Sequence, residues 1–239
     1  MESSDLYHRE IVTLITADGV GNETGAVLLR EHELGVSVNE QYVMSLVCTD
    51  QYLEELVMGR LLTDGFIESA EDVSAILFNN NKTEVSVILN NDITVRERRP
   101  LRALPKPDYK IEWIFSMAER FAKGTDLHDM TACAHSCILS RKGEILFICE
   151  DIGRHNALDK AVGYALGSGI PLSECILYTS GRVPVDMAKK PIAAGIPVLA
   201  SKSLPTAEAL DLAKEYGLLI IGNARPDSVK IFSEKNSFF

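Results

Sequence analysis

Two cysteines and a histidine stand close together near the middle of the sequence, at Cys133, His135 and Cys137. A cysteine thiolate near a histidine or an arginine is a nucleophile that can accept a sulfur atom and pass it on. On a strand the three side chains would share a face and could bind zinc, whereas on a helix His135 would point away. A further alternative is that both cysteines are buried thiols without chemistry. These residues alone leave the alternatives open.

Four short apolar runs in the second half of the chain are each followed by polar residues. The runs are residues 145–149, 175–178, 197–200 and 218–221, and the polar clusters are residues 150–156, 179–182, 201–203 and 222–225. If the runs are parallel strands, the clusters share the carboxyl edge of one sheet, where ligands usually bind. Arg182, Lys202 and Arg225 could each bind an anionic ligand through charge-assisted hydrogen bonds.

The cluster at residues 179–181 is expected just before a helix, where free backbone N–H groups attract phosphate. The alternative is that Ser180 and Ser203 only cap helices and that the cations are solvated. His155 and Asp159 are four residues apart on an expected helix and could touch. The chain contains no glycine-rich P-loop and no Gly-x-Gly-x-x-Gly motif, so a standard nucleotide-binding fold is not expected.

The periodicity of apolar residues changes near residue 100. Before it, strands are expected at residues 11–15, 26–29, 34–38 and 42–48, a helix at 50–63, and a hairpin of strands 73–78 and 85–89. After it, helices at residues 108–122, 151–166, 183–194 and 206–216 alternate with short strands, which predicts a parallel or mixed sheet covered by helices. We therefore expect a small α+β domain of mostly antiparallel strands at residues 1–106 and an α/β domain at residues 107–239.

The basic segment at residues 96–106 is expected to be the linker between these domains, either as a solvated loop or as a contact for an acidic partner. The whole chain of 239 residues has a net charge of −10, which argues against general nucleic-acid binding. No run of about eighteen apolar residues suggests a membrane span, and the first ten residues contain no apolar signal core. The five cysteines do not resemble a secreted disulfide framework, so we expect a cytoplasmic protein.

Residues 150–160, with the sequence Glu-Asp-Ile-Gly-Arg-His-Asn-Ala-Leu-Asp-Lys, resemble the signature of the FdhD/NarQ family of formate dehydrogenase accessory sulfurtransferases. Residues 179–182, 194–203 and 221–225 match this family too, as do residues 48–49 and 53–62. The resemblance covers roughly residues 30 to 235. It implies a C-terminal domain similar to the cytidine deaminase-like αβα sandwich, and such proteins often pair subunits into a dimer.

The resemblance also implies a function in which sulfur passes from a cysteine desulfurase to the molybdenum cofactor, bis-molybdopterin guanine dinucleotide, before that cofactor enters formate dehydrogenase. A guanine nucleotide would mimic part of this ligand. By the family pattern the cofactor site includes Ile221, Gly222, Asn223, Ala224 and Arg225. The further candidate binding residues are Thr179, Ser180, Gly181, Arg182, Ser201, Lys202, Ser203, Asp151, Arg154 and His155.

The chain departs from the family pattern at the sulfur carrier. The family usually has a Cys-x-x-Cys motif between its domains, but residues 96–106 contain no cysteine. Its Thr-Gly-Gly-x-His motif corresponds to residues 131–135, where Cys133 replaces the second glycine. One hypothesis is therefore an enzyme in which Cys133 or Cys137 carries the persulfide, assisted by His135. A second is a binding module that chaperones the cofactor without sulfur transfer, and a third is a zinc site. The Pro-Cys-x-x-Cys motif of zinc deaminases is absent, so deamination is not expected.

Overall fold

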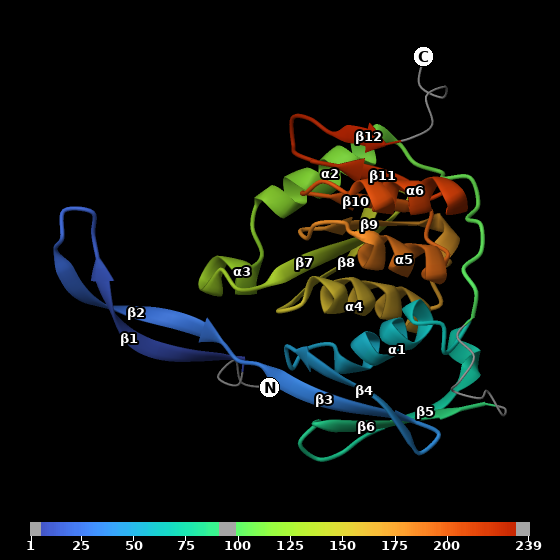
Figure 1. Cartoon of the computed structure of the whole chain (residues 1–239), viewed down its shortest axis with the longest axis horizontal. Helices are drawn as coiled ribbons and strands as arrows, with labels where there is room; N and C mark the ends of the chain where they lie inside the picture. Colours follow the sequence, from blue (N-terminus) through green and yellow to red (C-terminus); the bar gives the residue numbers. More distant parts are fainter. Residues whose placement is uncertain (1–5, 91–98, 233–239) are drawn as a thin grey trace.

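The computed structural model describes residues 6–90 and 99–232, which form three β-sheets and six α-helices (Figure 1). The first half contains β1 (Tyr7–Ile15), β2 (Gly21–Leu29), β3 (His32–Val38), β4 (Gln41–Cys48), α1 (Leu53–Thr63), β5 (Val73–Phe78) and β6 (Glu84–Leu89). The second half contains α2 (Ile111–Ala122), α3 (Asp126–Thr131), β7 (His135–Arg141), β8 (Glu144–Asp151), α4 (Arg154–Gly167), β9 (Cys175–Thr179), α5 (Val185–Ala194), β10 (Val198–Ser201), α6 (Ala207–Tyr216), β11 (Leu219–Gly222) and β12 (Lys230–Phe232).

The large sheet of the second half has the strand order β12-β11-β10-β9-β7-β8. Strands β9, β10 and β11 are parallel to one another, whereas β7 runs antiparallel to both β8 and β9. Strand β8 therefore points the same way as β9, so the carboxyl ends of β8, β9, β10 and β11 lie along one edge. The prediction of a mixed sheet is confirmed.

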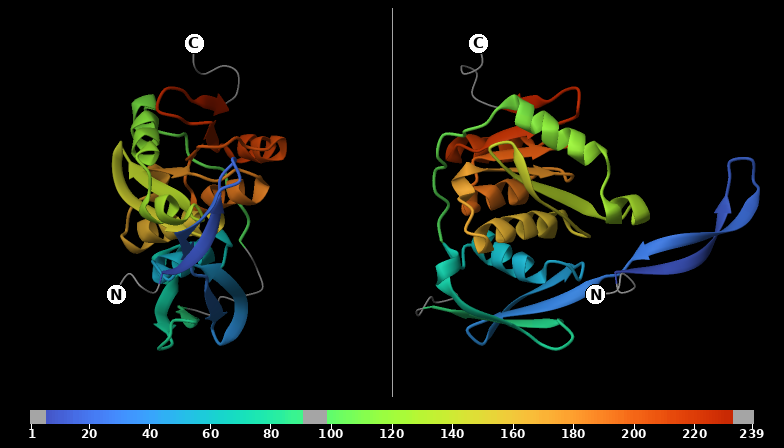
Figure 2. Two further views of the ribbon diagram at one scale, coloured as in Figure 1. Left: turned by 90° about the vertical axis from the view of Figure 1, so that its left-hand side faces the viewer. Right: turned by 180° about the vertical axis from the view of Figure 1, so that it is seen from behind.

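Helices cover both faces of this sheet. Along β9, Leu177 belongs to the apolar core that includes Leu158 of α4 and Met187 of α5, whereas Ile176 and Tyr178 pack with Ile114 of α2. This alternation follows from the two-residue period of a strand, and it gives an αβα arrangement in which α2 lies on the face opposite α4, α5 and α6 (Figures 1 and 2). The more specific expectation of a cytidine deaminase-like fold stays a prediction.

The first half forms a four-stranded sheet in the order β4-β3-β6-β5, in which only β3 and β6 are parallel. The expected hairpin of β5 and β6 is present. Helix α1 packs between this sheet and α4, where Gly59 and Gly163 let the two helix backbones approach closely (Figure 1). Because the apolar core continues across this contact, the division of the chain at residue 106 stays a prediction.

Strands β1 and β2 form a separate two-stranded ribbon that extends away from the body of the molecule (Figures 1 and 2). We call this ribbon, residues 7–29, the arm. Sequence periodicity predicted strands only at residues 11–15 and 26–29, so it missed half of each strand. The missing residues are largely polar and exposed, and they continue the ribbon through backbone pairing, which leaves no apolar pattern.

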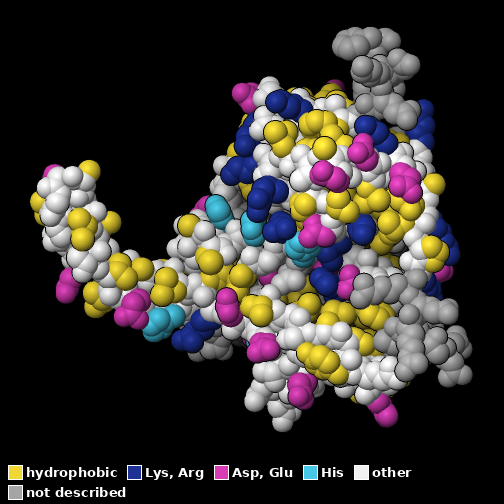
Figure 3. All heavy atoms as spheres, in the orientation of Figure 1, with side chains coloured by type: hydrophobic (Ala, Val, Ile, Leu, Met, Phe, Trp, Pro, Cys, Tyr) yellow, Lys and Arg dark blue, Asp and Glu magenta, His cyan; other side chains and the backbone are white. Residues whose placement is uncertain are grey.

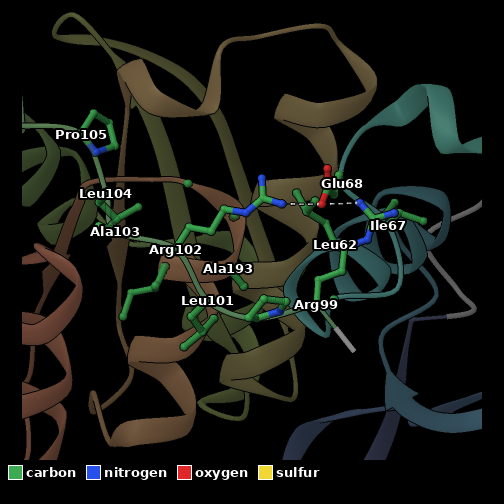
Figure 4. Close-up of a pocket in the computed structure, with 15 residues that line it drawn as sticks. Leu62, Ile67, Glu68, Arg99, Leu101, Arg102, Ala103, Leu104, Pro105 and Ala193 are labelled. Atoms are coloured by element: carbon green, nitrogen blue, oxygen red, sulfur yellow. Dashed lines mark hydrogen bonds and ion pairs between the residues drawn. The ribbon is translucent and has the colours of Figure 1, made fainter. Parts of the chain in front are cut away.

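The described part of the linker lies across the two halves and covers a cavity of about 260 Å³ (Figure 4). Arg99 and Arg102 both form ion pairs with Glu68, at 2.8 and 3.0 Å, and the Leu104 N–H donates to the carbonyl of Tyr216. These two arginines of the linker therefore bind an acidic group of the same chain. Residues 96–98 of the expected linker lie outside the described residues. Within the described residues, no helix is long and apolar enough to cross a bilayer.

Candidate functional site

The polar clusters predicted from the sequence do meet at one edge of the large sheet. We call this edge the carboxyl edge, and it consists of residues 150–156, 179–182, 201–203 and 222–225 together with His135 at the start of β7. His135 pairs in register with Asp151, and Thr179 pairs with Ser201. Hydrogen bonds also join the loops directly, because the Lys202 N–H donates to Thr179 O at 3.0 Å and the Asn223 N–H to Ser203 O at 2.9 Å. The prediction of a shared edge is confirmed.

Several hydroxyl groups at the carboxyl edge hold the loops in shape. The Ser201 hydroxyl donates to Gly181 O at 2.7 Å and accepts from the Ser203 N–H, and the Thr179 hydroxyl accepts from the Gly181 N–H. Gly181 packs directly against Arg154, since a Cβ at this position would lie 2.9 Å from the arginine side chain. These residues thus position the edge, and Ser201 and Thr179 are fully buried.

The expectation that residues 179–181 directly precede a helix is wrong. Helix α5 begins only at Val185, after Pro184, because Val183 first forms a parallel bridge with Pro205. The alternative that Ser180 and Ser203 cap helices is also wrong, since Thr206 caps α6 and no side chain caps α5.

Ser180 instead contacts His135. The His135 Nδ1 atom lies 3.1 Å from the Ser180 hydroxyl oxygen, which also accepts from the Ser136 N–H at 3.0 Å. Burial lowers the pKa of His135, and the nearby positive charge of Arg154 lowers it further. His135 is therefore mainly neutral near pH 7, so it acts as a hydrogen-bonding group. The positive charge at this site comes from Arg154 and Arg182.

Cys133 is the exposed one of the five cysteines, all of which lie within the described residues. It follows α3, just after Ala132, which adopts a left-handed conformation with φ of 54°. The loop is fixed on both sides, because the Cys133 N–H donates to the Thr131 hydroxyl and His128 Nδ1 lies 2.9 Å from Ala134 O. The Cys133 thiol is therefore exposed on a fixed loop, two residues before His135.

Cys137 is fully buried on β7, and burial raises the pKa of its thiol well above the usual range. It is also in register with Cys149, whose pKa burial raises to about 12. A buried, protonated thiol is neither accessible nor nucleophilic. Cys133 and Cys137 therefore do not act as a pair in this structure, and among the described residues no three His, Cys, Asp or Glu side chains gather as a metal site.

Asp151 is a positioning residue. One carboxylate oxygen of Asp151 accepts from the Thr49 N–H and pairs with Lys160 at 2.6 Å, and the other accepts from Gly153 N–H and from the Asn156 amide. Both oxygens are therefore occupied by groups of the same chain. Lys160 is fully buried, and it ties the end of β8 to the first half of the chain through its hydrogen bond to the Thr49 hydroxyl at 2.7 Å.

His155 and Asp159 do not pair with each other as suggested, because each forms an ion pair with another residue. His155 Nε2 lies 3.2 Å from a carboxylate oxygen of Asp186, and the buried Asp159 pairs with Lys190 at 2.6 Å. Asp159 also accepts from the Thr63 hydroxyl. The two residues do lie one turn apart on a helix, but the His155 imidazole and the Asp159 carboxylate bind residues of α1 and α5 instead.

Two arginines at the carboxyl edge carry nitrogen atoms without a partner. Arg225 Nη1 and Arg154 Nε are both buried and form no hydrogen bond with the described residues. A buried, charged donor without a partner is costly, so such atoms indicate a place for an anionic ligand. Lysine, arginine and histidine side chains gather on the side of the α/β body that faces the arm (Figure 3).

The remaining residues of the expected cofactor site are held by contacts within the protein. Ile221 and Ala224 are buried, and Ala224 O accepts a hydrogen bond from the Tyr178 hydroxyl. Gly222 fits closely against Phe232, and Asn223 takes a left-handed φ of 48°. Lys202 Nζ lies 5.3 Å above the ring of Phe121.

Sequence reasoning placed Glu150 in a polar cluster but gave it no role in the site. The buried carboxylate of Glu150 accepts from the Leu127 N–H at 2.8 Å and the His128 N–H at 2.9 Å, and so anchors the first turn of α3. Helix α3 was itself not predicted, because its six residues are too short for an apolar period. The sequence signal that could have indicated this anchor was Glu150 itself, a carboxylate at the end of an apolar strand.

The fold and the carboxyl edge together define a class: a mixed α/β protein whose sheet ends in a cation-lined edge beside an exposed thiol. The chain belongs to the FdhD/NarQ family, whose model matches residues 29–106 and 94–238. It is 36% identical to the sulfur carrier protein FdhD of Saccharolobus solfataricus over 204 residues, which is 78% of this chain and 79% of the relative. It is 31% identical to protein FdhD of Methanocaldococcus jannaschii over 85% of this chain and 86% of the relative.

A solved structure supports the same relationship. The crystal structure described as a formate dehydrogenase accessory protein from Desulfotalea psychrophila matches with a TM-score of 0.86 and 26% sequence identity. The match covers 98% of this chain and 100% of the other. Because the arm spans residues 7–29 of 239, a match of this extent includes most of it.

Proposed function

We propose that this protein acts in the cytoplasm in the maturation of formate dehydrogenase, as a sulfur carrier in which Cys133 holds the transferred sulfur. The observation that carries the proposal is the exposure of Cys133 alone among five cysteines, on a loop beside the cation-lined carboxyl edge. The names of the relatives, sulfur carrier protein and formate dehydrogenase accessory protein, support this role.

The sulfur step needs no outside oxidant. A cysteine desulfurase presents a persulfide, and the Cys133 thiolate attacks its terminal sulfur. A new S–S bond forms on Cys133, the S–S bond of the desulfurase breaks, and its cysteine leaves as a thiolate. Arg154 and Arg182 place positive charge around His135, two residues after Cys133, and neutral His135 would be the candidate to accept the thiol proton.

The ligand that would receive this sulfur is the molybdenum cofactor bis-molybdopterin guanine dinucleotide, which brings phosphates, guanine and the metal-bound sulfur chemistry. The residues of the carboxyl edge fit its anionic part, since Arg225 Nη1 and Arg154 Nε are buried donors without a partner among the described residues. Arg182 and Lys202 would add further charge. Asp151, Thr179 and Ser201 would hold the loops in place, because their polar atoms are already hydrogen bonded.

A second candidate function is a chaperone that binds the cofactor without transferring sulfur. The absence of cysteine from residues 96–106, where the family usually carries Cys-x-x-Cys, favours it. The two functions differ in one respect, because only the sulfur carrier needs the Cys133 thiol.

Intact-protein mass spectrometry after incubation with a cysteine desulfurase and cysteine tests the proposal. We expect the wild-type chain to gain the mass of one sulfur atom, removable by a thiol reductant. Cys133→Ala should gain none, and Cys137→Ala should load normally because that thiol is buried. Loading of Cys133→Ala, or no loading of the wild type while its thiols are intact, would contradict the sulfur-carrier function.

A further inference from the structure

Helix α3 is too short to be stable through its own sequence, because a helix of six residues forms few internal hydrogen bonds. Its N-cap residue, Thr125, provides no side-chain cap, and the Thr125 hydroxyl instead pairs with the Ser136 hydroxyl at 2.9 Å. The N–H groups of the first turn are left for a residue outside the helix. The shape of the Cys133 loop, residues 131–134, therefore depends on a tertiary contact.

The Glu150 carboxylate makes this contact. Each of its two oxygens accepts one hydrogen bond from the first turn of α3, from the Leu127 N–H at 2.8 Å and from the His128 N–H at 2.9 Å. Glu150 is buried near the carboxyl end of β8, and a hydrogen bond to a carboxylate is roughly twice as strong as one between neutral groups. A glutamine at this position has one acceptor oxygen and could serve only one of the two N–H groups.

A first path of hydrogen bonds leads from this contact to the backbone of Cys133. The Leu127 carbonyl accepts from the Thr131 hydroxyl at 2.6 Å. The oxygen of the same hydroxyl accepts from the Cys133 N–H at 3.2 Å. Glu150 therefore fixes Leu127, and Leu127 fixes the side chain that binds the Cys133 backbone.

A second path runs through His128 and fixes both neighbours of Cys133. The His128 carbonyl accepts from the Ala132 N–H at 2.7 Å, and His128 Nδ1 lies 2.9 Å from the Ala134 carbonyl oxygen. Because a carbonyl oxygen can only accept, Nδ1 carries the proton in this contact. The two residues that Glu150 binds thus hold the chain before, at and after Cys133.

Glu150 is itself held by the core of the carboxyl edge. Its backbone carbonyl accepts from Lys160 Nζ at 3.3 Å and from the Thr49 hydroxyl at 3.4 Å. It is also paired in register with Ser136 on β7, whose hydroxyl contacts the start of α3. The Cys133 loop and the carboxyl edge therefore form one rigid unit.

We propose that Glu150 is the positioning residue for sulfur acceptance at Cys133, and that the Cys133 loop is a fixed carrier which reacts without swinging out of place. This inference rests on the sulfur-carrier function proposed above and concerns the same exchange between thiolate and persulfide. Cys133 is the group that reacts, whereas Glu150 acts through α3. Holding a nucleophile in one orientation favours attack in line with the bond that breaks, and a shift of about 1 Å can cost on the order of 100-fold in rate.

Two reactions of Cys133 separate positioning from simple exposure. Sulfur loading by a cysteine desulfurase needs a thiol presented in one orientation to a protein partner, whereas alkylation by iodoacetamide needs only an exposed thiol. We expect Glu150→Gln to load sulfur about tenfold or more slowly than the wild type. Its alkylation rate should remain close to that of the wild type, because the Cys133 thiol stays exposed.

Two further variants complete the comparison. Thr131→Val removes the hydroxyl that binds the Cys133 N–H and leaves the buried Glu150 in place, so it should also load slowly while its alkylation is normal. This variant keeps the test decisive if Glu150→Gln folds poorly. Glu144→Gln is the matched control, since Glu144 is exposed at the opposite end of β8 and should load at the wild-type rate.

Circular dichroism and hydrogen exchange show whether each variant is folded and whether α3 is loosened. The Leu127 and His128 amides should exchange faster in Glu150→Gln than in the wild type. Unchanged exchange, unchanged loading of Glu150→Gln and Thr131→Val, or loss of loading and alkylation in equal proportion would each overturn the positioning role. If the wild type itself gains no sulfur while its thiols are intact, the sulfur-carrier function fails, and this inference fails with it.

Discussion

Cys133 and Cys137 are four residues apart and have opposite chemical environments. The first is exposed on a loop that Glu150 and His128 hold in place, and the second is fully buried on β7. Sequence spacing alone could not separate them, because it does not show where β7 begins. With β7 starting at His135, Cys133 precedes the strand and Cys137 faces the core.

The Arg225 guanidinium should contribute directly to ligand binding. We expect Arg225→Ala to weaken binding of guanosine diphosphate about tenfold or more, since hydrogen bonds to charged groups contribute about 1.5–3 kcal/mol. Isothermal titration calorimetry measures this change. Arg141→Ala is the matched control, because Arg141 pairs with Glu174 at the opposite end of β7. Equal affinities of wild type and Arg225→Ala would remove Arg225 from the site.

The protonation of His135 should make stability depend on pH. Its folded-state pKa is lowered below 6.5 by burial and by Arg154, so the folded state binds fewer protons than the unfolded state. The contribution of His135 to stability is therefore fully present above about pH 6.5 and is lost as the pH falls from about 6.5 toward the lowered folded-state pKa. Between pH 7.5 and pH 5.5, an interval that spans the usual histidine pKa of about 6.5, we expect the melting temperature of His135→Gln to decrease less than that of the wild type. An identical pH dependence in both proteins would show that His135 is not involved.

At the scale of secondary structure, the contact of α1 with α4 joins the two halves of the chain. A Cβ on Gly163 would lie 1.9 Å from Glu55 O, and one on Gly59 would lie 1.8 Å from Asp159 O. The buried pairs Asp159–Lys190 and Asp151–Lys160 surround this contact. The helices therefore have little freedom to separate, and the carboxyl edge is held by the same elements.

Gly163→Ala should test this crossing. Its methyl group would force the two backbones apart, so we expect a loss of about 3 kcal/mol or more in the free energy of unfolding, measured by urea denaturation. Gly167→Ala lies on the same helix with no atom within 4 Å and should be neutral or slightly stabilising. Similar stabilities of the two variants would mean that the helices separate without cost.

The alternation of apolar runs and helices was sufficient to predict the large sheet and the meeting of polar clusters at its edge. It was sufficient because residues such as Leu177 and Tyr178 are buried on opposite faces of one strand. It failed where the partner of a side chain depends on tertiary structure, as for His155, which pairs with Asp186 instead of Asp159. The buried Lys160 is a further case, since only the folded chain brings Thr49 to it.

At the scale of the whole molecule, helix α3, which ends just before Cys133, lies on the side of the α/β body that faces the arm, where basic side chains also gather (Figures 1 and 3). Helix α3, which ends at the Cys133 loop, also contacts β2 at the base of the arm.

The most direct test of the central claim is formate dehydrogenase activity in a host that lacks its own member of the family. We expect the wild-type chain to restore activity, and Cys133→Ala to fail although it is folded and still binds guanosine diphosphate. Cys137→Ala should restore activity, provided that it is expressed at the same level. Full restoration by Cys133→Ala would contradict sulfur transfer through this residue and would support the cofactor chaperone.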